Sequence, residues 1–133
     1  MTRGARFQGV PAWPRALVIP VEGPITELEL RRPDSLRQLQ EAVGGYIEAV
    51  DLPEFIRDSE RATCYVNEEG KLTGLPFNGR ATDLLVPGVG LFWGDYIAGP
   101  MVVCGFNPET GGNTSIPPGV ERRIRLIERE SLT

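Results

Sequence analysis

The stretch Asp34–Leu52, DSLRQLQEAVGGYIEAVDL, changes from a helical to a strand pattern and thereby decides the fold. Its first half carries apolar residues three and four positions apart, at 36, 39 and 43, which predicts one buried face of an α-helix. Asp34 or Ser35 can cap this helix, and from Ser35 the side chain of Gln38 has capping-box spacing. Gly44 fits the left-handed position that ends a helix. We therefore predict a helix that stops at Gly44 and a strand over residues 46–52.

An uninterrupted helix through this stretch is the alternative, because Ile47 and Val50 continue the helical period. Such a helix would hold Gly44 and Gly45 in its interior. Two consecutive glycines there cost about 2 kcal/mol of helix stability. This cost favours the helix that ends at Gly44.

A β-hairpin is predicted on the N-terminal side of the helix. Its first strand covers Ala16–Val21, and its second covers Ile25–Leu30 with Leu28 and Leu30 facing inward. The tripeptide Glu-Gly-Pro between the two strands is typical of a turn. Residues 1–14 are predicted to form a loose leader or arm.

The rest of the chain predicts a second hairpin, two helices and loops. Residues 53–61 form a connector with a helical turn around Phe55 and Ile56, and Val120, Ile124 and Ile127 mark one face of a terminal helix. The predicted elements are strands at 62–66 and 71–75 around a turn at 67–70, a short helix at 79–85 capped by Asn78, a Gly-rich loop at 86–94, one or two strands within 95–106, a long loop at 107–119 and a helix at 120–131.

This order of elements predicts an α+β fold. We expect a mostly antiparallel sheet with one main helix packed on a face, plus a C-terminal helix. A hairpin followed by a helix gives the N-terminal part a β-grasp-like topology, by analogy only. A chain of 133 residues has the length of one domain, which we place at residues 15–133.

The composition excludes several classes of function. The chain contains no histidine, which removes Ser-His and Cys-His nucleophiles and imidazole-based zinc sites. Its two cysteines, Cys64 and Cys104, lie in apolar strand-like runs typical of buried thiols. A net charge of −4 without a basic stripe argues against non-specific binding to nucleic acid. With no predicted membrane span or signal peptide, we expect a cytoplasmic protein with no cofactor and no metal.

The start of the short helix is the first candidate site. Asn78, Arg80 and Thr82 lie near exposed N–H groups, and a guanidinium at a helix N-terminus can recognise phosphate or carboxylate. The structural alternative is that Asn78 caps, Arg80 is solvated and Thr82 packs. In the turn before it, the structural alternative is that Asn67 and Glu68 form the turn and Lys71 makes a cross-turn ion pair.

The Gly-rich loop PGVGLFWGDY is the second candidate, because Phe92 and Trp93 could stack on a base or fill a partner's pocket. The alternative is that both rings hold the loop against the core. Together the two candidates predict a ligand-binding set without catalytic residues: Asn67, Glu68, Lys71, Phe77, Asn78, Arg80, Thr82, Phe92, Trp93 and Asp95.

Three segments in order, LQEAVGGYIEAV, VNEEGKLTGLPFNGRAT and GDYIAGPMVVCG, resemble a family of small domains of unknown function found in phages, mobile elements and actinobacteria. The resemblance covers residues 16–105. Its pattern is a leucine-rich helix ending in Gly-Gly, then Asn-Glu-Glu-Gly-Lys-Leu and Leu-Pro-x-Asn, and Gly44, Asn67, Gly70, Pro76 and Asn78 occupy pattern positions. The resemblance implies an α+β domain in a phage-like setting and implies no reaction.

Three functions are compatible with these observations. The first is a non-enzymatic binder that sequesters a nucleotide-like ligand such as a host-defence second messenger, and that forms homo-oligomers through the terminal helix or the leader. The second is a protein–protein inhibitor or adaptor of a host factor. The third, and least favoured, is a Mg²⁺-dependent nucleotide-processing enzyme that uses Glu68, Asp83 and Asp95.

Overall fold

The computed structural model describes all residues except 1–5, 8–9, 12, 53–60, 86–94 and 131–133. Most of the predicted connector at 53–61, with Phe55 and Ile56, lies outside the described residues. So does the predicted Gly-rich loop at 86–94, with Phe92 and Trp93.

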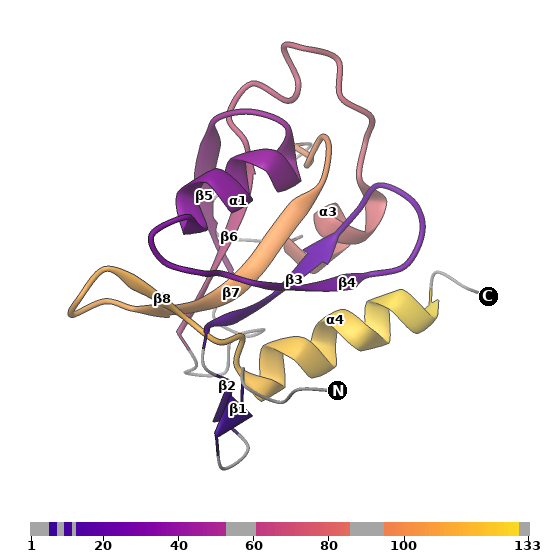
Figure 1. Ribbon diagram of the computed structural model, residues 1–133. Helices are drawn as coiled ribbons and strands as arrows, with labels where there is room; N and C mark the ends of the chain where they lie inside the picture. The colour runs from indigo at the N-terminus through magenta and orange to yellow at the C-terminus, as the bar shows by residue number, and fades with distance from the viewer. Residues whose placement is uncertain (1–5, 8–9, 12, 53–60, 86–94, 131–133) are drawn as a thin grey trace.

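A six-stranded antiparallel sheet forms the centre of the fold, in the order β4-β3-β7-β6-β5, with β8 also paired to β7 (Figure 1). Three helices of the described residues pack on it, so the α+β class and the terminal helix are confirmed. The elements are β3 (Arg15–Ile19), β4 (Thr26–Glu29), α1 (Ser35–Val43), β5 (Ile47–Asp51), β6 (Ala62–Asn67), α3 (Gly79–Leu85), β7 (Met101–Asn107), β8 (Gly112–Thr114) and α4 (Pro118–Glu130).

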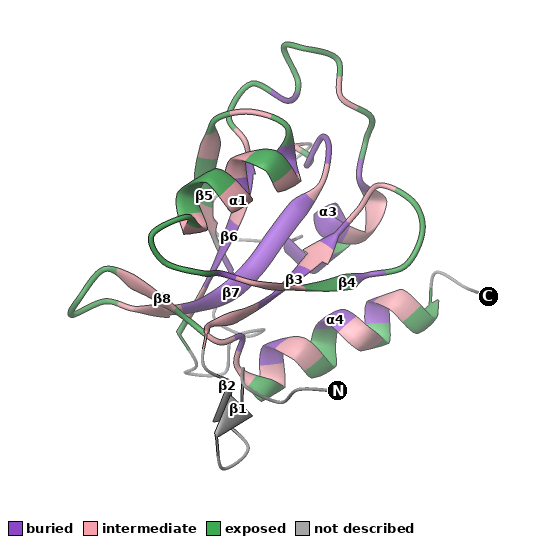
Figure 2. Ribbon diagram, viewed as in Figure 1, coloured by how far each residue is buried: buried purple, intermediate pink, exposed green. Residues whose placement is uncertain are grey.

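Alternation along the strands builds one hydrophobic cluster on each face of the sheet. On β7, Val102 and Cys104 face the side covered by α1, whereas Met101 and Val103 face the side covered by α3 and α4. Because both faces of the central strand are covered, β7 is the most continuously buried strand (Figure 2). The β3–β4 hairpin followed by α1 is the arrangement on which the β-grasp analogy rests.

Helix α1 ends as the sequence predicts. Gly44 adopts φ 81°, in the left-handed region, and its N–H donates to the carbonyl oxygen of Gln40 at 2.8 Å. The predicted capping box of Ser35 and Gln38 is wrong, because Ser35 is the first residue of the helix and the cap position belongs to Asp34, which makes no side-chain cap hydrogen bond. The Gln38 amide turns instead to the end of β4, accepting from the N–H of Arg31 and donating to the carbonyl oxygen of Glu29, both at 2.7 Å.

The predicted hairpin of strands 62–66 and 71–75 is wrong. Residues 68–74 form consecutive turns, and no strand follows them before the single bridge between Phe77 and Ala98. Both edges of β6 are already paired, to β5 on one side and to β7 on the other. The loop expected at 107–119 also differs, since it contains β8 and the start of α4.

The predicted leader contains a short structured element. Strands β1 (Arg6–Phe7) and β2 (Val10–Pro11) pair in an antiparallel two-stranded sheet apart from the main sheet.

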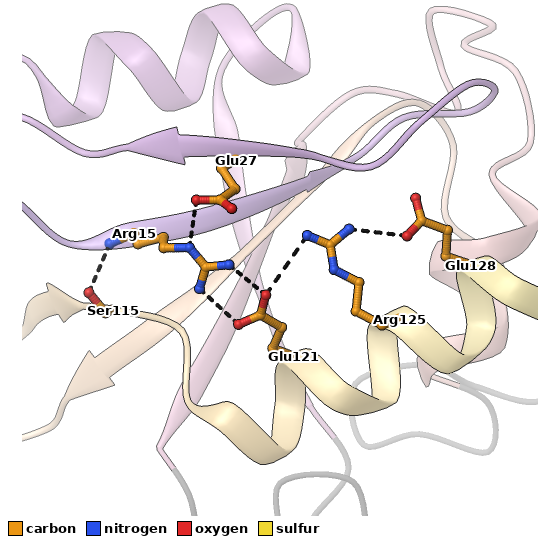
Figure 3. A network of polar contacts seen from close by, with 6 residues as sticks. All are labelled: Arg15, Glu27, Ser115, Glu121, Arg125 and Glu128. Carbon is orange, nitrogen blue, oxygen red and sulfur yellow. Dashed lines mark hydrogen bonds and ion pairs between the residues drawn. The ribbon is translucent and has the colours of Figure 1, made fainter. Parts of the chain in front are cut away.

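A network of polar contacts joins α4 to the β3–β4 hairpin (Figure 3). Arg15 on β3 donates to both carboxylate oxygens of Glu121, at 2.8 and 2.5 Å, and its Nε donates to Glu27 at 2.6 Å. Further along α4, Glu128 accepts from the N–H of Ile25 at 3.0 Å and pairs with Arg125 at 3.1 Å.

These contacts shift the acid–base properties of three carboxyl groups. The hydrogen bond from Arg15 holds the pKa of Glu121 and that of Glu27 below the ordinary value, with partial burial opposing the shift. The N–H of Ile25 and the guanidinium of Arg125 lower the pKa of Glu128 in the same way. The ionised forms are therefore the ones that hold α4 in place.

Candidate functional site

Asn78 lies wholly inside the protein, at 0% exposure, and every polar atom of its side chain has a protein partner. Its Oδ1 accepts from the N–H of Ala81 at 3.0 Å, which is the predicted cap of α3. Its Nδ2 donates to the carbonyl oxygens of Ile19, at 3.0 Å, and Gly99, at 2.9 Å. Asn78 thus joins β3, α3 and the segment before β7, and no polar atom remains for a ligand.

Thr82 has a similar structural role. Its hydroxyl donates to the carbonyl oxygen of Asn78 at 2.8 Å and accepts from the N–H of Ile97 at 2.9 Å, and the residue is buried. The N–H groups of Ala81 and Thr82 are themselves bonded to Asn78. This corrects the expectation that the side chains of Asn78 and Thr82 are open to an anionic ligand.

Arg80 is the residue of this group that faces a cleft. One terminal nitrogen of its half-buried guanidinium donates to the carbonyl oxygen of Pro20 at 2.7 Å, which fixes the side chain against the β3–β4 loop. The cleft is about 590 Å³ and is also lined by Glu22 and Glu128. It therefore presents one cation between two carboxylates.

Asn67 shapes the turn that follows β6. Its Oδ1 accepts from the N–H of Glu69 at 2.8 Å, and its Nδ2 donates to the carbonyl oxygen of Val43 at 3.1 Å, at the end of α1. The first bond is the local side-chain–backbone contact that favours asparagine in turns. The second bond attaches the turn to the helix, so Asn67 acts as a turn former. The side chain of Glu68 is exposed, and its backbone N–H donates to the carbonyl oxygen of Tyr46 at 2.8 Å.

Two aromatic rings meet on the other side of this turn. The ring centroids of Phe77 and Tyr96 are 5.8 Å apart with an interplanar angle of 53°. Lys71 forms an ion pair with Asp95, and its ammonium group lies 4.8 Å from the centroid of the Tyr96 ring. The structure therefore brings together Lys71, Phe77 and Asp95 from the predicted set and adds Tyr96, which no sequence pattern indicated.

The turn at residues 68–77 packs against residues 98–99, just before β7. The N–H of Gly99 donates to the carbonyl oxygen of Pro76 at 2.7 Å, and Phe77 forms a β-bridge with Ala98. A Cβ added to Gly70 would lie 2.8 Å from the carbonyl oxygen of Ala98. This close approach requires glycine at position 70 and holds the turn in one arrangement.

We define the turn surface as Tyr46, Asn67–Phe77, Asp95 and Tyr96. Two open grooves flank the turn and share Asn67. One, of about 540 Å³, lies towards the end of α1 and is lined by Tyr46 and Leu75, and the other, of about 290 Å³, is lined by Glu48 and Leu72.

The described residues contain no group of three His, Cys, Asp or Glu side chains that could hold a metal ion. The carboxylates of Glu68, Asp83 and Asp95, on which a Mg²⁺ site was conceivable from sequence, are therefore not gathered into such a group. Both thiols are buried and are not joined in a disulfide, and burial raises the pKa of Cys104 to about 12. Within the described part of the chain, no helix is long and apolar enough to cross a membrane.

A protein-family model matches residues 14–128 of this chain, a range that contains the helix ending at Gly44, the Asn67 turn and the buried Asn78. The chain belongs to the DUF3846 family, a domain of unknown function. The DUF3846 match begins one residue before β3 and ends within α4, so it includes the whole six-stranded sheet and excludes β1 and β2. No curated protein and no solved structure matches the chain.

Proposed function

We propose that this DUF3846 domain is a non-enzymatic binding module that contacts a protein partner through its turn surface. The observation that carries the proposal is the position of exposed apolar side chains. Among the described residues, six large hydrophobic side chains are exposed, and four of them belong to the turn surface: Tyr46, Leu72, Phe77 and Tyr96. Gathered exposed apolar groups of this kind mark interaction sites, and aromatic residues are enriched in them.

The charges around these side chains indicate the chemistry of the partner. The turn surface carries the carboxylates of Glu68, Glu69 and Asp95 against the single ammonium group of Lys71, which is already paired with Asp95. An acidic surface with exposed aromatic rings complements Lys or Arg side chains, which pair with carboxylates and bind the faces of rings. This charge balance favours a cationic protein segment over a phosphate-bearing ligand at the same place.

The chemistry of the chain supports binding over catalysis. Without histidine, a nucleophile has no imidazole base, and the buried Cys104 thiol remains protonated at neutral pH. The resemblance to phage and mobile-element domains supports a role as an inhibitor or adaptor of a host factor in the bacterial cytoplasm.

Affinity capture from a bacterial lysate with paired variants tests this proposal. Leu72 is 86% exposed and Tyr46 is 70% exposed, so the double variant Tyr46→Ser, Leu72→Ser removes apolar contact area with little loss of packing. The matched control is Leu36→Ser, because Leu36 on α1 is 55% exposed and lies outside the turn surface.

We expect a stoichiometric protein, with basic residues at its contact surface, to be captured by the natural chain and by Leu36→Ser and lost by the double variant. Equal capture by all three proteins, or no stoichiometric partner for any of them, would reject the turn surface as the binding site.

Sequestration of a nucleotide-like ligand is a second candidate, and the Arg80 cleft favours it. Arg80 is held in position by Pro20 and retains donor groups towards a cleft large enough for a nucleotide. Thermal shift against cyclic and ADP-ribose-type nucleotides tests this candidate. If the cleft binds a nucleotide, that nucleotide should raise the unfolding temperature of the natural chain and not that of Arg80→Gln. If no nucleotide raises the unfolding temperature, this candidate function is rejected.

A further inference from the structure

The outer face of α4 carries a row of cations around one exposed leucine. Val120, Ile124 and Ile127 are buried against the sheet. At 3.6 residues per turn, Arg122, Leu126 and Arg129 lie on the opposite side of the helix. Both arginines are exposed, and Leu126 is 45% exposed. The two arginines are seven residues apart, or about 10 Å along the helix axis.

The positive charge of this face is not neutralised by the contacts that fasten α4. Arg125, at the border of the face, pairs with Glu121 and Glu128, and Glu121 also pairs with Arg15. Arg122 and Arg129 form no ion pair with any residue that the structure describes. Their guanidinium forks therefore remain free to recognise carboxylate or phosphate groups.

We propose that the face formed by Arg122, Leu126 and Arg129 docks an acidic amphipathic helix of a partner protein. The cation, the apolar group and the second cation are spaced at i, i+4 and i+7, so they lie on one side of the helix. A second helix with two carboxylates seven residues apart and an apolar residue between them has the complementary period. A shallow groove of about 500 Å³ runs along this face, and the described residues that line it all come from α4.

Leu126 decides between a protein and a phosphate backbone as the occupant. A phosphodiester chain has no apolar group in line with its phosphates to cover an exposed leucine, whereas an amphipathic helix has one. The net charge of −4 also opposes long-range attraction of nucleic acid.

This second surface does not rest on the function proposed for the turn surface. The two surfaces carry opposite charges and are well separated, since the turn between β6 and α3 is at the top of Figure 1 and α4 lies in its lower half. A chain with both surfaces can hold a cationic and an anionic partner together, which is the geometry of an adaptor.

The test measures binding of a fluorescent peptide made of four Glu-Ala-Gln-Leu-Ala-Gln-Ala heptads, by anisotropy at low and moderate salt. We expect binding that weakens about tenfold or more in Arg122→Glu, Arg129→Glu and also weakens in Leu126→Ser. The matched control is Arg123→Glu, which makes the same charge reversal at an exposed arginine outside the row and should change affinity about twofold or less. Circular dichroism verifies that each variant is folded.

Three outcomes would overturn the proposal. They are no binding of the peptide, a loss of peptide affinity in Arg123→Glu as large as in Arg122→Glu, Arg129→Glu, or binding of a twelve-nucleotide oligothymidylate as tight as that of the peptide. Sedimentation showing that the natural chain associates with itself through these arginines would replace the partner helix with a second copy. The variant Tyr46→Ser, Leu72→Ser should bind the peptide normally, so failure at one surface is distinguished from failure at the other.

Discussion

Arg15 and Glu121 form a two-pronged ion pair in which both terminal nitrogens of the guanidinium meet both oxygens of the carboxylate, at 2.8 and 2.5 Å. The pair links β3 to the first turns of α4, and both side chains are less than a quarter exposed. Parallel charged hydrogen bonds of this geometry are the stronger kind, because the two planar groups match.

Replacing Glu121 by glutamine should lower the free energy of unfolding by about 1–2 kcal/mol. The amide keeps the shape of the side chain but loses the charge that matches Arg15. Urea denaturation measures the change. Arg122→Gln, one residue further along α4 and exposed, is the matched control and should stay within about 0.5 kcal/mol of the natural chain. An equal fall in the free energy of unfolding of the control would show that the Arg15–Glu121 pair contributes no more to stability than an exposed side chain.

Stability should depend on pH on the acid side of neutrality. The pKa values of Glu27, Glu121 and Glu128 are lower in the folded chain than the ordinary value of 4.5, so folding favours their ionised forms. This contribution is complete above the unfolded pKa and is lost as pH falls through the folded pKa values.

Thermal unfolding followed by circular dichroism should therefore give a midpoint that is flat from about pH 6 to 8 and that falls below about pH 5. In Glu121→Gln the fall should be smaller, because one of the three shifted groups is gone. An identical fall in this variant would mean that other carboxyl groups cause the acid sensitivity.

Asn78→Ala should be among the most destabilising single substitutions in the chain. It removes the cap of α3 and leaves the carbonyl oxygens of Ile19 and Gly99 without their buried donor, for a loss of about 3 kcal/mol. Asp83→Ala, at an exposed position of the same helix, should change the free energy of unfolding by about 0.5 kcal/mol or less. Similar urea midpoints for the two variants would contradict the structural role of Asn78.

The Cys104 thiol should resist alkylation in the folded chain. Its pKa of about 12 follows from burial, and the Asn113 amide donates to the sulfur at 3.2 Å. At pH 8 only about one thiol in ten thousand is then ionised. Mass spectrometry after iodoacetamide treatment should show labelling of Cys104 in urea and none in the native state on the same time scale. Rapid native labelling would indicate that the sheet opens at β7.

Local signals predicted the helices and most strands correctly. Leu39 and Val43 of α1 face the protein core with the expected period, Gly44 ends that helix, and Asn78 caps α3. Leu36, which was predicted on the same buried face, is instead 55% exposed. These features depend on residues within a few positions of one another. The capping box failed because Gln38 had a better partner in the backbone near Glu29, nine residues away.

The strand predicted at 71–75 failed for a non-local reason. It was predicted because the turn residues at 67–70 are typical of a hairpin, but β5 and β7 pair with β6 and leave no free edge for a further strand. Tyr96 was missed as a member of the turn surface, since its contact with Phe77 joins two segments that the sequence does not relate.

The sequence alone was sufficient to establish the α+β class and the end of the first helix, and its lack of histidine excluded imidazole chemistry. It was not sufficient to tell polar side chains that build the core from those that face solvent. Asn78 and Thr82 were indistinguishable from ligand-binding groups until Ile19, 59 residues away, and Ile97 were placed against them. The reason is physical: periodicity and capping act over a few residues, whereas burial arises when distant segments pack together.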